Sequence, residues 1–192
     1  MSLELIIGPM FAGKSSAIIR IVNRYRSIGY PILLVSHSFD NRYSAEPMVV
    51  NHDNVKIPCL HWSDLMSHVD DTEYKAARLI IVEEAQFFPR LREFVVKAVD
   101  VDRKNVIVVG LDGDADRKPF GEILDLVPLA DRIEKVRAFC ADCMNGTEAL
   151  FSYCKKAERT AQVCVGGADT YMPLCREHYV ARTGHTKVVS VK

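Results

Sequence analysis

The segment GPMFAGKS at positions 8–15 carries the most specific chemistry in this sequence. It fits the spacing GxxxxGK[ST], in which glycines let backbone N–H groups turn toward phosphate oxygens and the following helix points its positive end at them. Lys14 would reach the β- and γ-phosphates of a nucleotide, and the Ser15 hydroxyl would help to hold Mg²⁺. We expect a triphosphate to be bound here, by Gly8, Pro9, Met10, Phe11, Ala12, Gly13, Lys14 and Ser15.

Two adjacent carboxylates, Glu83 and Glu84, end the apolar run LIIVEE. An acidic residue at the end of a buried strand beside a phosphate loop can contact Mg²⁺ directly or through water. Adjacent strand residues point to opposite sides, so the two carboxylates cannot share one task. We expect one to face the metal and the other to face an acceptor pocket, where it can take a proton from an attacking hydroxyl. The alternative is a solvated strand end, since acidic residues also favour helix starts.

Two short chelating pairs, Cys140-x-x-Cys143 and Cys175-x-x-His178, lie in the last third of the chain. The two-residue gaps let both side chains of a pair reach one ion, and two pairs complete a tetrahedral Cys₃His shell. Because no position is left for water, such a site would be structural. His185 is a weaker alternative ligand, and unrelated cysteines are the alternative to any site. The remaining cysteines lack such partners and are expected to be small buried residues: Cys59, Cys154 and Cys164.

Four apolar runs, at 3–8, 31–36, 78–84 and 105–111, are expected to position these groups as strands. Their residues do not alternate between apolar and polar, as they would in a sheet with one solvent-exposed face. This pattern favours parallel strands that are covered on both faces. Two segments between them have apolar residues at helical spacing. The first contains Ile18, Ile21, Val22 and Tyr25 and stops at Gly29, and the second starts with Pro89 in its first turn and contains Leu91, Phe94, Val95 and Ala98. The order predicts a doubly wound α/β fold with a parallel sheet.

Composition limits the remaining possibilities. Of the 192 residues 48% are apolar, which is enough for a proper core, and 25 basic residues balance 25 acidic ones. Zero net charge argues against a protein that mainly coats nucleic acid. We find no run long enough to span a bilayer and no leader segment, so we expect a cytoplasmic protein with no membrane or nucleic-acid partner. Near Val136 the long apolar runs give way to cysteines, glycines and short polar runs. We therefore expect an α/β domain at 1–136 and a small metal-binding domain at 137–192.

The motifs in their order closely resemble the zinc-containing thymidine kinases of the cellular and poxviral type. The resemblance covers nearly the whole chain. It rests on these segments: GPMFAGKSS, DNRYS at 40–44, NHD at 51–53, EEAQFFP at 83–89, LDG followed by RKPFG ending at Gly121, CADC, VGGADTY and CREHY.

The resemblance implies transfer of the γ-phosphate of ATP to the 5′-hydroxyl of thymidine, with Mg²⁺ and one structural Zn²⁺ per chain. It places Glu84 where the family keeps its general base, and it implies a homo-oligomer, a dimer of dimers. Further cofactor contacts are expected from Asp40, Asn41, Arg42, Glu83 and Gln86. A loop anchored by zinc would lie over the thymine base, which the family binds largely through backbone groups. The expected substrate contacts are Met10, Phe87, Leu111, Ala115, Phe120, Ser152, Gln162, Val163, Cys164, Val165, Gly166 and Tyr171.

Four positions depart from the family pattern. Family members usually have aspartate at Glu83, arginine at Cys154 and a threonine near the thymine methyl at Ser152. At Ala115 they have an aromatic residue that stacks on the base, a contact worth about 1–3 kcal/mol. Its loss predicts roughly 5- to 150-fold weaker nucleoside binding, unless a nearby ring fills the gap, for which the candidates are Phe87, Phe120 and Phe151.

Two other functions compete with a thymidine kinase. The departures suggest a catalytically weak or inactive member that retains ATP and zinc as a binding module. A phosphate loop with a zinc knuckle is also compatible with an ATPase or a nucleic-acid-handling protein, although the sequence has no basic stripe with interleaved aromatics.

Overall fold

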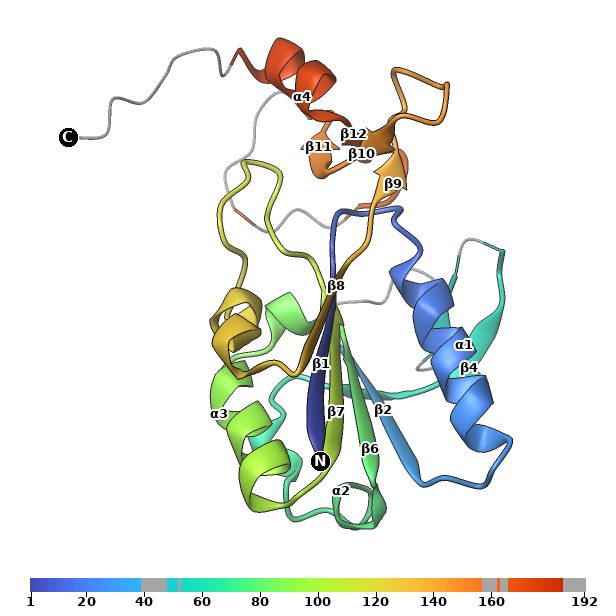
Figure 1. Cartoon of the computed structure of the whole chain (residues 1–192), viewed down its shortest axis with the longest axis vertical. Coiled ribbons are helices and arrows are strands. Elements are labelled where there is room, and N and C mark those ends of the chain that lie inside the picture. The colour runs from blue at the N-terminus through green and yellow to red at the C-terminus, as the bar shows by residue number, and fades with distance from the viewer. Residues whose placement is uncertain (39–47, 52, 157–161, 163–165, 185–192) are drawn as a thin grey trace, which may run out of the picture.

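The computed structural model describes residues 1–38, 48–51, 53–156, 162 and 166–184 (Figure 1). Its centre is a six-stranded sheet in the order β5-β2-β6-β7-β1-β8, in which every neighbouring pair is parallel. The predicted α/β fold with a parallel sheet is therefore confirmed. The strands are β1 (Ser2–Ile7), β2 (Ile32–His37), β5 (Leu60–Trp62), β6 (Leu79–Glu83), β7 (Asn105–Gly110) and β8 (Arg132–Lys135).

Helices cover both faces of this sheet, with α1 (Lys14–Arg26) and α3 (Leu91–Val96) on opposite sides (Figure 1). Successive strand residues pack into two different cores because side chains alternate along a strand. Ile81 of β6 packs in the core that contains Ile18, Ile19 and Val22 of α1. The next residue, Val82, packs in the core that contains Phe94 of α3. This double burial explains why the strand sequences read as continuous apolar runs.

The second predicted helix begins later than expected. Pro89 and Arg90 form a turn, and α3 begins at Leu91, so the placement of Pro89 in the first helical turn is wrong. Arg90 has a left-handed backbone with φ of 54°, which the right-handed helix cannot include. The helix continues from α3 into the π-helical turn η3 (Lys97–Val101).

Short elements fill the connections between the main strands. A two-stranded antiparallel hairpin, β3 (Met48–Val50) with β4 (Lys56–Pro58), packs near α1. The other short helices are η1 (Met66–His68), α2 (Thr72–Ala76), η2 (Ala85–Phe87) and η4 (Ile123–Leu129). Of these, η2 matters for the site, because it directly follows the two carboxylates at the end of β6.

The chain leaves the central sheet after β8 and forms small antiparallel pairs at the end of the molecule where β1 and β7 finish (Figure 1). One pair is β9 (Ala138–Phe139) with β10 (Glu148–Ala149), and the other is β11 (Phe151–Cys154) with β12 (Tyr171–Leu174). The helix α4 (Arg176–Thr183) follows. Ala149, Leu174 and Tyr179, all fully buried, form a separate small core here.

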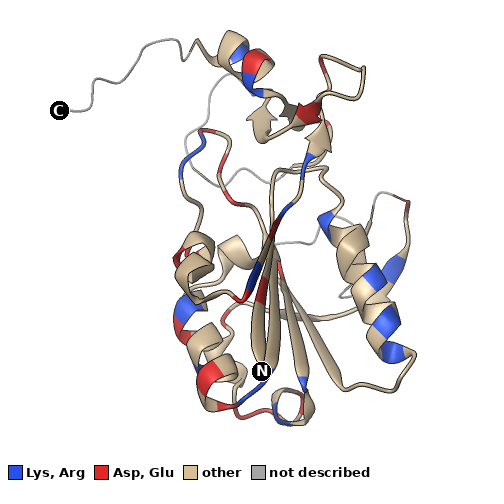
Figure 2. Ribbon diagram, viewed as in Figure 1, with Lys and Arg blue, Asp and Glu red and all other residues tan. Residues whose placement is uncertain are grey.

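Charged side chains lie mostly on the helices and loops, and the central strands carry few of them (Figure 2). Helix α1 carries Lys14, Arg20, Arg24 and Arg26 and no acidic residue. Within the described part of the chain, every helix is too short or too polar to cross a bilayer.

Candidate functional site

The phosphate loop joins the end of β1 to the start of α1. Gly8 passes so close to the chain that follows β8 that a Cβ there would lie 2.3 Å from the carbonyl oxygen of Val136. Gly13, just before the helix, has φ of 76°, a conformation that glycine adopts without strain. The Lys14 ammonium donates to the carbonyl oxygens of Gly8 (3.0 Å) and Pro9 (2.7 Å), so the lysine lies across its own loop.

Glu83 and the phosphate loop are in direct contact. The Ser15 hydroxyl donates to Oε1 of Glu83 at 2.9 Å, and only 6% of Glu83 is exposed. A hydroxyl and a carboxylate oxygen at this distance are the hard oxygen donors that Mg²⁺ prefers. The two residues expected to share the metal from sequence are thus neighbours.

Glu84 points elsewhere. It has a left-handed backbone with φ of 51° and ψ of 41°, so the chain turns sharply after β6. Its Oε2 accepts a 2.6 Å hydrogen bond from Nε2 of Gln86. The two adjacent glutamates therefore have different partners, as expected, but the reason differs from the prediction. Because β6 ends at Glu83, it is the left-handed turn at Glu84, and not alternation along a strand, that separates the side chains.

His37, at the end of β2, lies close enough to Glu84 to interact with its charge. Burial lowers the pKa of His37, whereas a hydrogen bond with the backbone of Ser63 and the negative charge of Glu84 raise it to a smaller extent. The ring also packs edge-on against Phe88, with centroids 4.7 Å apart. The histidine next to Glu84 is therefore biased toward its neutral form, and sequence reasoning did not identify it.

Ala115 is buried in a small cluster with Cys154 and Tyr171, with Met10 and Phe11 packed at its edge. The predicted substrate contacts Ala115 and Tyr171 thus meet two phosphate-loop residues where β7 leads out of the sheet, and one of these, Met10, is also a predicted substrate contact. Open α/β sheets bind ligands at this carboxyl edge. The tip of the phosphate loop and the Ala115 loop therefore face the same space.

The three phenylalanines that could have replaced the missing aromatic side chain lie elsewhere. Phe87 and Phe120 contact each other edge to face, with centroids 5.3 Å apart. Phe151 packs against Tyr179, with centroids 5.0 Å apart. Among the described residues, the rings in the Ala115 cluster are those of Tyr171 and Phe11.

Two hydrogen bonds connect the C-terminal sheets to these loops. The Ser152 hydroxyl accepts from the backbone N–H of Met10 at 2.9 Å, and the buried Tyr179 hydroxyl donates to the carbonyl oxygen of Ala115 at 2.7 Å. Sequence reasoning missed Tyr179 as a site residue. The signal available was its position directly after His178 in CREHY.

The loop expected to cover the base is described in part. The Gln162 side chain donates to Oδ2 of Asp114 at 2.8 Å and to the carbonyl oxygen of Pro119 at 3.1 Å. Gly166 lies against Thr170, where a Cβ would come within 2.3 Å of the threonine hydroxyl. Six of the predicted contacts lie outside the described residues: Asp40, Asn41, Arg42, Val163, Cys164 and Val165.

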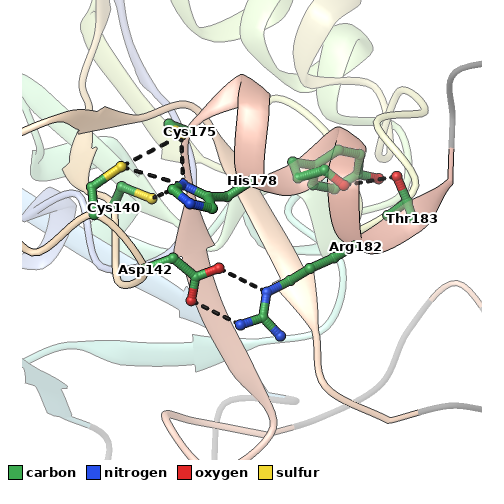
Figure 3. Close-up of polar contacts among 8 residues, drawn as sticks. Cys140, Asp142, Cys175, His178, Arg182 and Thr183 are labelled. Atoms are coloured by element: carbon green, nitrogen blue, oxygen red, sulfur yellow. Dashed lines mark hydrogen bonds and ion pairs between the residues drawn. The ribbon is translucent and has the colours of Figure 1, made fainter.

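The structure brings the predicted metal ligands together. Cys140, Cys143, Cys175 and His178 place one ligand atom each within 4.8 Å of one another. Nδ1 of His178 lies 3.3–3.6 Å from the three sulfurs, and the Cys143 and Cys175 sulfurs are 3.9 Å apart (Figure 3). Three sulfurs and one imidazole nitrogen at these separations fit a closed tetrahedral zinc shell.

The thiols of the cluster differ in acidity, since burial and the neighbouring sulfurs raise the pKa of Cys143 to about 11 whereas that of Cys140 is lowered. Burial alone would raise the pKa of Cys140, but backbone N–H groups of Cys175, Cys143 and Asp142 donate to its sulfur and lower the pKa to about 6. The thiolate is the form that binds metal. Asp142 also forms a two-pronged ion pair with Arg182 of α4, at 2.8 Å for both contacts, which ties the Cys140–Cys143 turn to the helix that carries His178 (Figure 3).

The buried state of the other described cysteines agrees with expectation. Cys59 and Cys154 are 9% and 6% exposed. Cys164 and the alternative ligand His185 lie outside the described residues.

Fold and site together define a parallel α/β protein with a glycine-rich lysine–serine loop at the carboxyl edge of its sheet and a Cys₃His cluster beside it. The family described as thymidine kinase matches residues 1–179. The chain is 40% identical to thymidine kinase a of Arabidopsis thaliana (100% of this chain, 79% of the relative), and 43% identical to the thymidine kinase of Oryza sativa subsp. japonica (93% and 66%). It is 38% identical to the thymidine kinase of Variola virus (93% and 96%). The chain belongs to the thymidine kinase family.

This membership confirms the resemblance drawn from the motifs. It does not favour the inactive binding module, and it identifies the family as one of nucleoside kinases rather than nucleic-acid-handling proteins.

Proposed function

We propose that this protein transfers the γ-phosphate of ATP to the 5′-hydroxyl of thymidine in pyrimidine salvage. The observation that carries the proposal is that two adjacent carboxylates contact different parts of the site. Glu83 contacts Ser15 of the phosphate loop, whereas Glu84 turns away from it. A phosphoryl transfer needs one acidic group toward the metal and another toward the attacking hydroxyl. Deoxyuridine is an expected second acceptor.

In this mechanism the backbone N–H groups of residues 8–15 hold the triphosphate, and Lys14 exchanges its contacts with Gly8 and Pro9 for the β- and γ-phosphates. Ser15 and Glu83 are suited to hold Mg²⁺, which neutralises charge on the transferred group. Glu84 accepts the proton of the 5′-hydroxyl as the new P–O bond forms, and ADP leaves. Asp40, Asn41 and Arg42 complete the phosphate side of this proposal.

The Cys₃His cluster is proposed to bind one structural Zn²⁺. It would fix β11, β12 and α4 over the nucleoside, so residues 137–192 act as a small lid unit beside an ATP-binding unit at 1–136. Tyr171, Ser152 and the backbone of residues 162–166 are the proposed base contacts there. We further propose that the enzyme is cytoplasmic and assembles as a dimer of dimers.

A phosphate-transfer assay tests the activity. With γ-labelled ATP, we expect labelled monophosphate from thymidine, less from deoxyuridine and no phosphate release without a nucleoside. Product from neither nucleoside would contradict the proposed function. Acceptor-independent phosphate release would indicate an ATPase instead.

Ala115→Phe should tighten thymidine binding. A ring restored at this position can lie against the base, which is worth about 1–3 kcal/mol, while ATP binding should change little. Because Cys154 and Tyr171 cover Ala115, the double variant with Cys154→Ala gives the ring more room. Isothermal titration with thymidine measures both variants. Equal or weaker binding by both would show that the base does not stack at this position.

A further inference from the structure

Gln86 is a buried polar side chain whose two ends both form hydrogen bonds. It lies in the middle of η2 and is 3% exposed. Its Nε2 donates to Oε2 of Glu84 at 2.6 Å, and its Oε1 accepts from the backbone N–H of Leu111 at 3.0 Å. One amide therefore links the candidate base after β6 to the first residue after β7.

The direction of the amide follows from its partners. A backbone N–H can only donate, so the amide oxygen must face Leu111. The NH₂ group must then face Glu84, and the Glu84 oxygen on that side must accept. This contact is thus compatible with an ionised Glu84, the form that can take up a proton.

Two glycines leave room for Gln86, one beside its side chain and one beside its backbone. A Cβ on Gly110 would come within 2.4 Å of Oε1 of Gln86, and a Cβ on Gly121 would come within 2.2 Å of its backbone oxygen. Gly121 also has φ of 59°, which favours glycine. A side chain at position 110 would therefore displace the amide oxygen, and one at position 121 would displace the backbone that carries it.

The carboxylate that Gln86 contacts lies on a backbone that needs support. The left-handed conformation of Glu84 is unfavourable for a residue other than glycine, so the turn is maintained by its surroundings. Because Gln86 and Glu84 are close in the chain, the hydrogen bond between their side chains spans this same turn. Holding Oε2 sets the plane of the carboxylate and hence the direction of Oε1.

We propose that Gln86 is a positioning residue that orients Glu84 for proton transfer and ties it to the Leu111 backbone. This inference rests on the proposed function, because it assumes that Glu84 is the base. It replaces the cofactor contact that the sequence suggested for Gln86. It also connects the base to the loop that begins at Leu111 and carries Ala115.

Gln86→Glu tests this role. The new side chain keeps an acceptor for the Leu111 N–H but replaces the NH₂ donor with a second carboxylate. Two carboxylates this close share a proton, so the acid limb of the kcat/KM profile for thymidine should move up by at least about one pH unit. At neutral pH kcat should fall about 10- to 100-fold, the usual loss when an orienting partner is removed. The KM for ATP should stay within about twofold.

The titration of other groups near Glu84 must be distinguished from the effect of the substitution at Gln86. His37 on β2 interacts electrostatically with Glu84, and Glu83 precedes it in the chain. The same profile should therefore be measured in His37→Gln and in Gln86→Met, which removes both polar ends without adding charge. Gln86→Met should lose turnover, and the acid limb of its profile should move up by less than that of Gln86→Glu, because it loses a hydrogen bond to the carboxylate without gaining a second charge.

Gln162→Glu is the matched control for the charge change. This second glutamine also donates to a carboxylate, that of Asp114, at 2.8 Å. The acid limb of the kcat/KM profile of Gln162→Glu should lie at the same pH as in the parent protein, even if the turnover of the variant changes.

A substrate-free measurement keeps the inference independent of the assay. The carboxyl carbon signal of Glu84, followed by NMR in labelled protein, should titrate at higher pH in Gln86→Glu than in the parent. An unchanged titration and an unchanged acid limb would overturn the positioning role, even if the variant were less stable. A parent without thymidine kinase activity would instead overturn the proposed function, and the NMR titration would still decide the contact.

Discussion

Glu84→Gln should lower kcat with thymidine about 10²- to 10⁴-fold, the usual contribution of a positioned general base. Glutamine keeps the shape of the side chain and an oxygen that can accept from Nε2 of Gln86, so the sharp turn after β6 should survive. It cannot take up the proton of the 5′-hydroxyl. We therefore expect a collapse of turnover, with thymidine affinity within about twofold of the parent and an unchanged melting temperature.

Glu83→Gln is the matched comparison, at the preceding residue, which is the last of β6. It removes the charge next to Ser15, so it should weaken Mg²⁺-dependent nucleotide binding and raise the Mg²⁺ concentration needed for half-maximal rate. Steady-state kinetics over a Mg²⁺ series separates the two variants. If Glu83→Gln alone abolished turnover at saturating Mg²⁺ while Glu84→Gln retained it, the roles of the two residues would be exchanged.

Cys143→Ser should abolish zinc binding and weaken thymidine binding at least about tenfold, or about 1.4 kcal/mol. Loss of one thiolate from a closed tetrahedral site removes much of the metal's binding energy, and that energy orders the surrounding chain. The ordered chain includes α4, whose Tyr179 donates to the carbonyl oxygen of Ala115. Metal analysis and thymidine titration measure the two losses.

Cys59→Ser is the control for removal of a buried thiol. Cys59 packs in the core beneath α1, away from the Cys₃His cluster, and its variant should bind one equivalent of zinc per chain. ATP binding should persist in both variants because the loop at residues 8–15 lies on β1 and α1. An active, well-folded parent with far less than one zinc per chain would contradict the structural role of the metal.

The sequence indicated the strands that lie in the middle of the sheet, because β1, β2, β6 and β7 are buried on both faces. It did not indicate β5 and β8, which lie at the two edges. Arg132–Lys135 reads RIEK and is mostly exposed, so neither a continuous apolar run nor a clean alternation marks it. Its strand state depends on pairing with β1, which no local pattern encodes.

The candidate site likewise has parts that could be predicted from the sequence and parts that could not. The phosphate loop and the ligand pairs were predictable because each has a fixed local spacing with one chemical use. The bonds from Ser152 to Met10, from Tyr179 to Ala115 and from Gln86 to Leu111 were not predictable. Each joins residues that are distant in the chain, and the partner is a backbone group whose identity leaves no trace in the sequence.

The bond between Met10 and Ser152 spans 142 positions and the bond between Ala115 and Tyr179 spans 64. During synthesis the phosphate loop is made long before Ser152, which braces it. The central sheet can assemble before then, since its last strand ends at Lys135. A nascent chain stalled shortly after β8 would therefore carry the strands of the sheet and an unbraced nucleotide loop, and the base side of the site would stay incomplete until residues 152–179 were made.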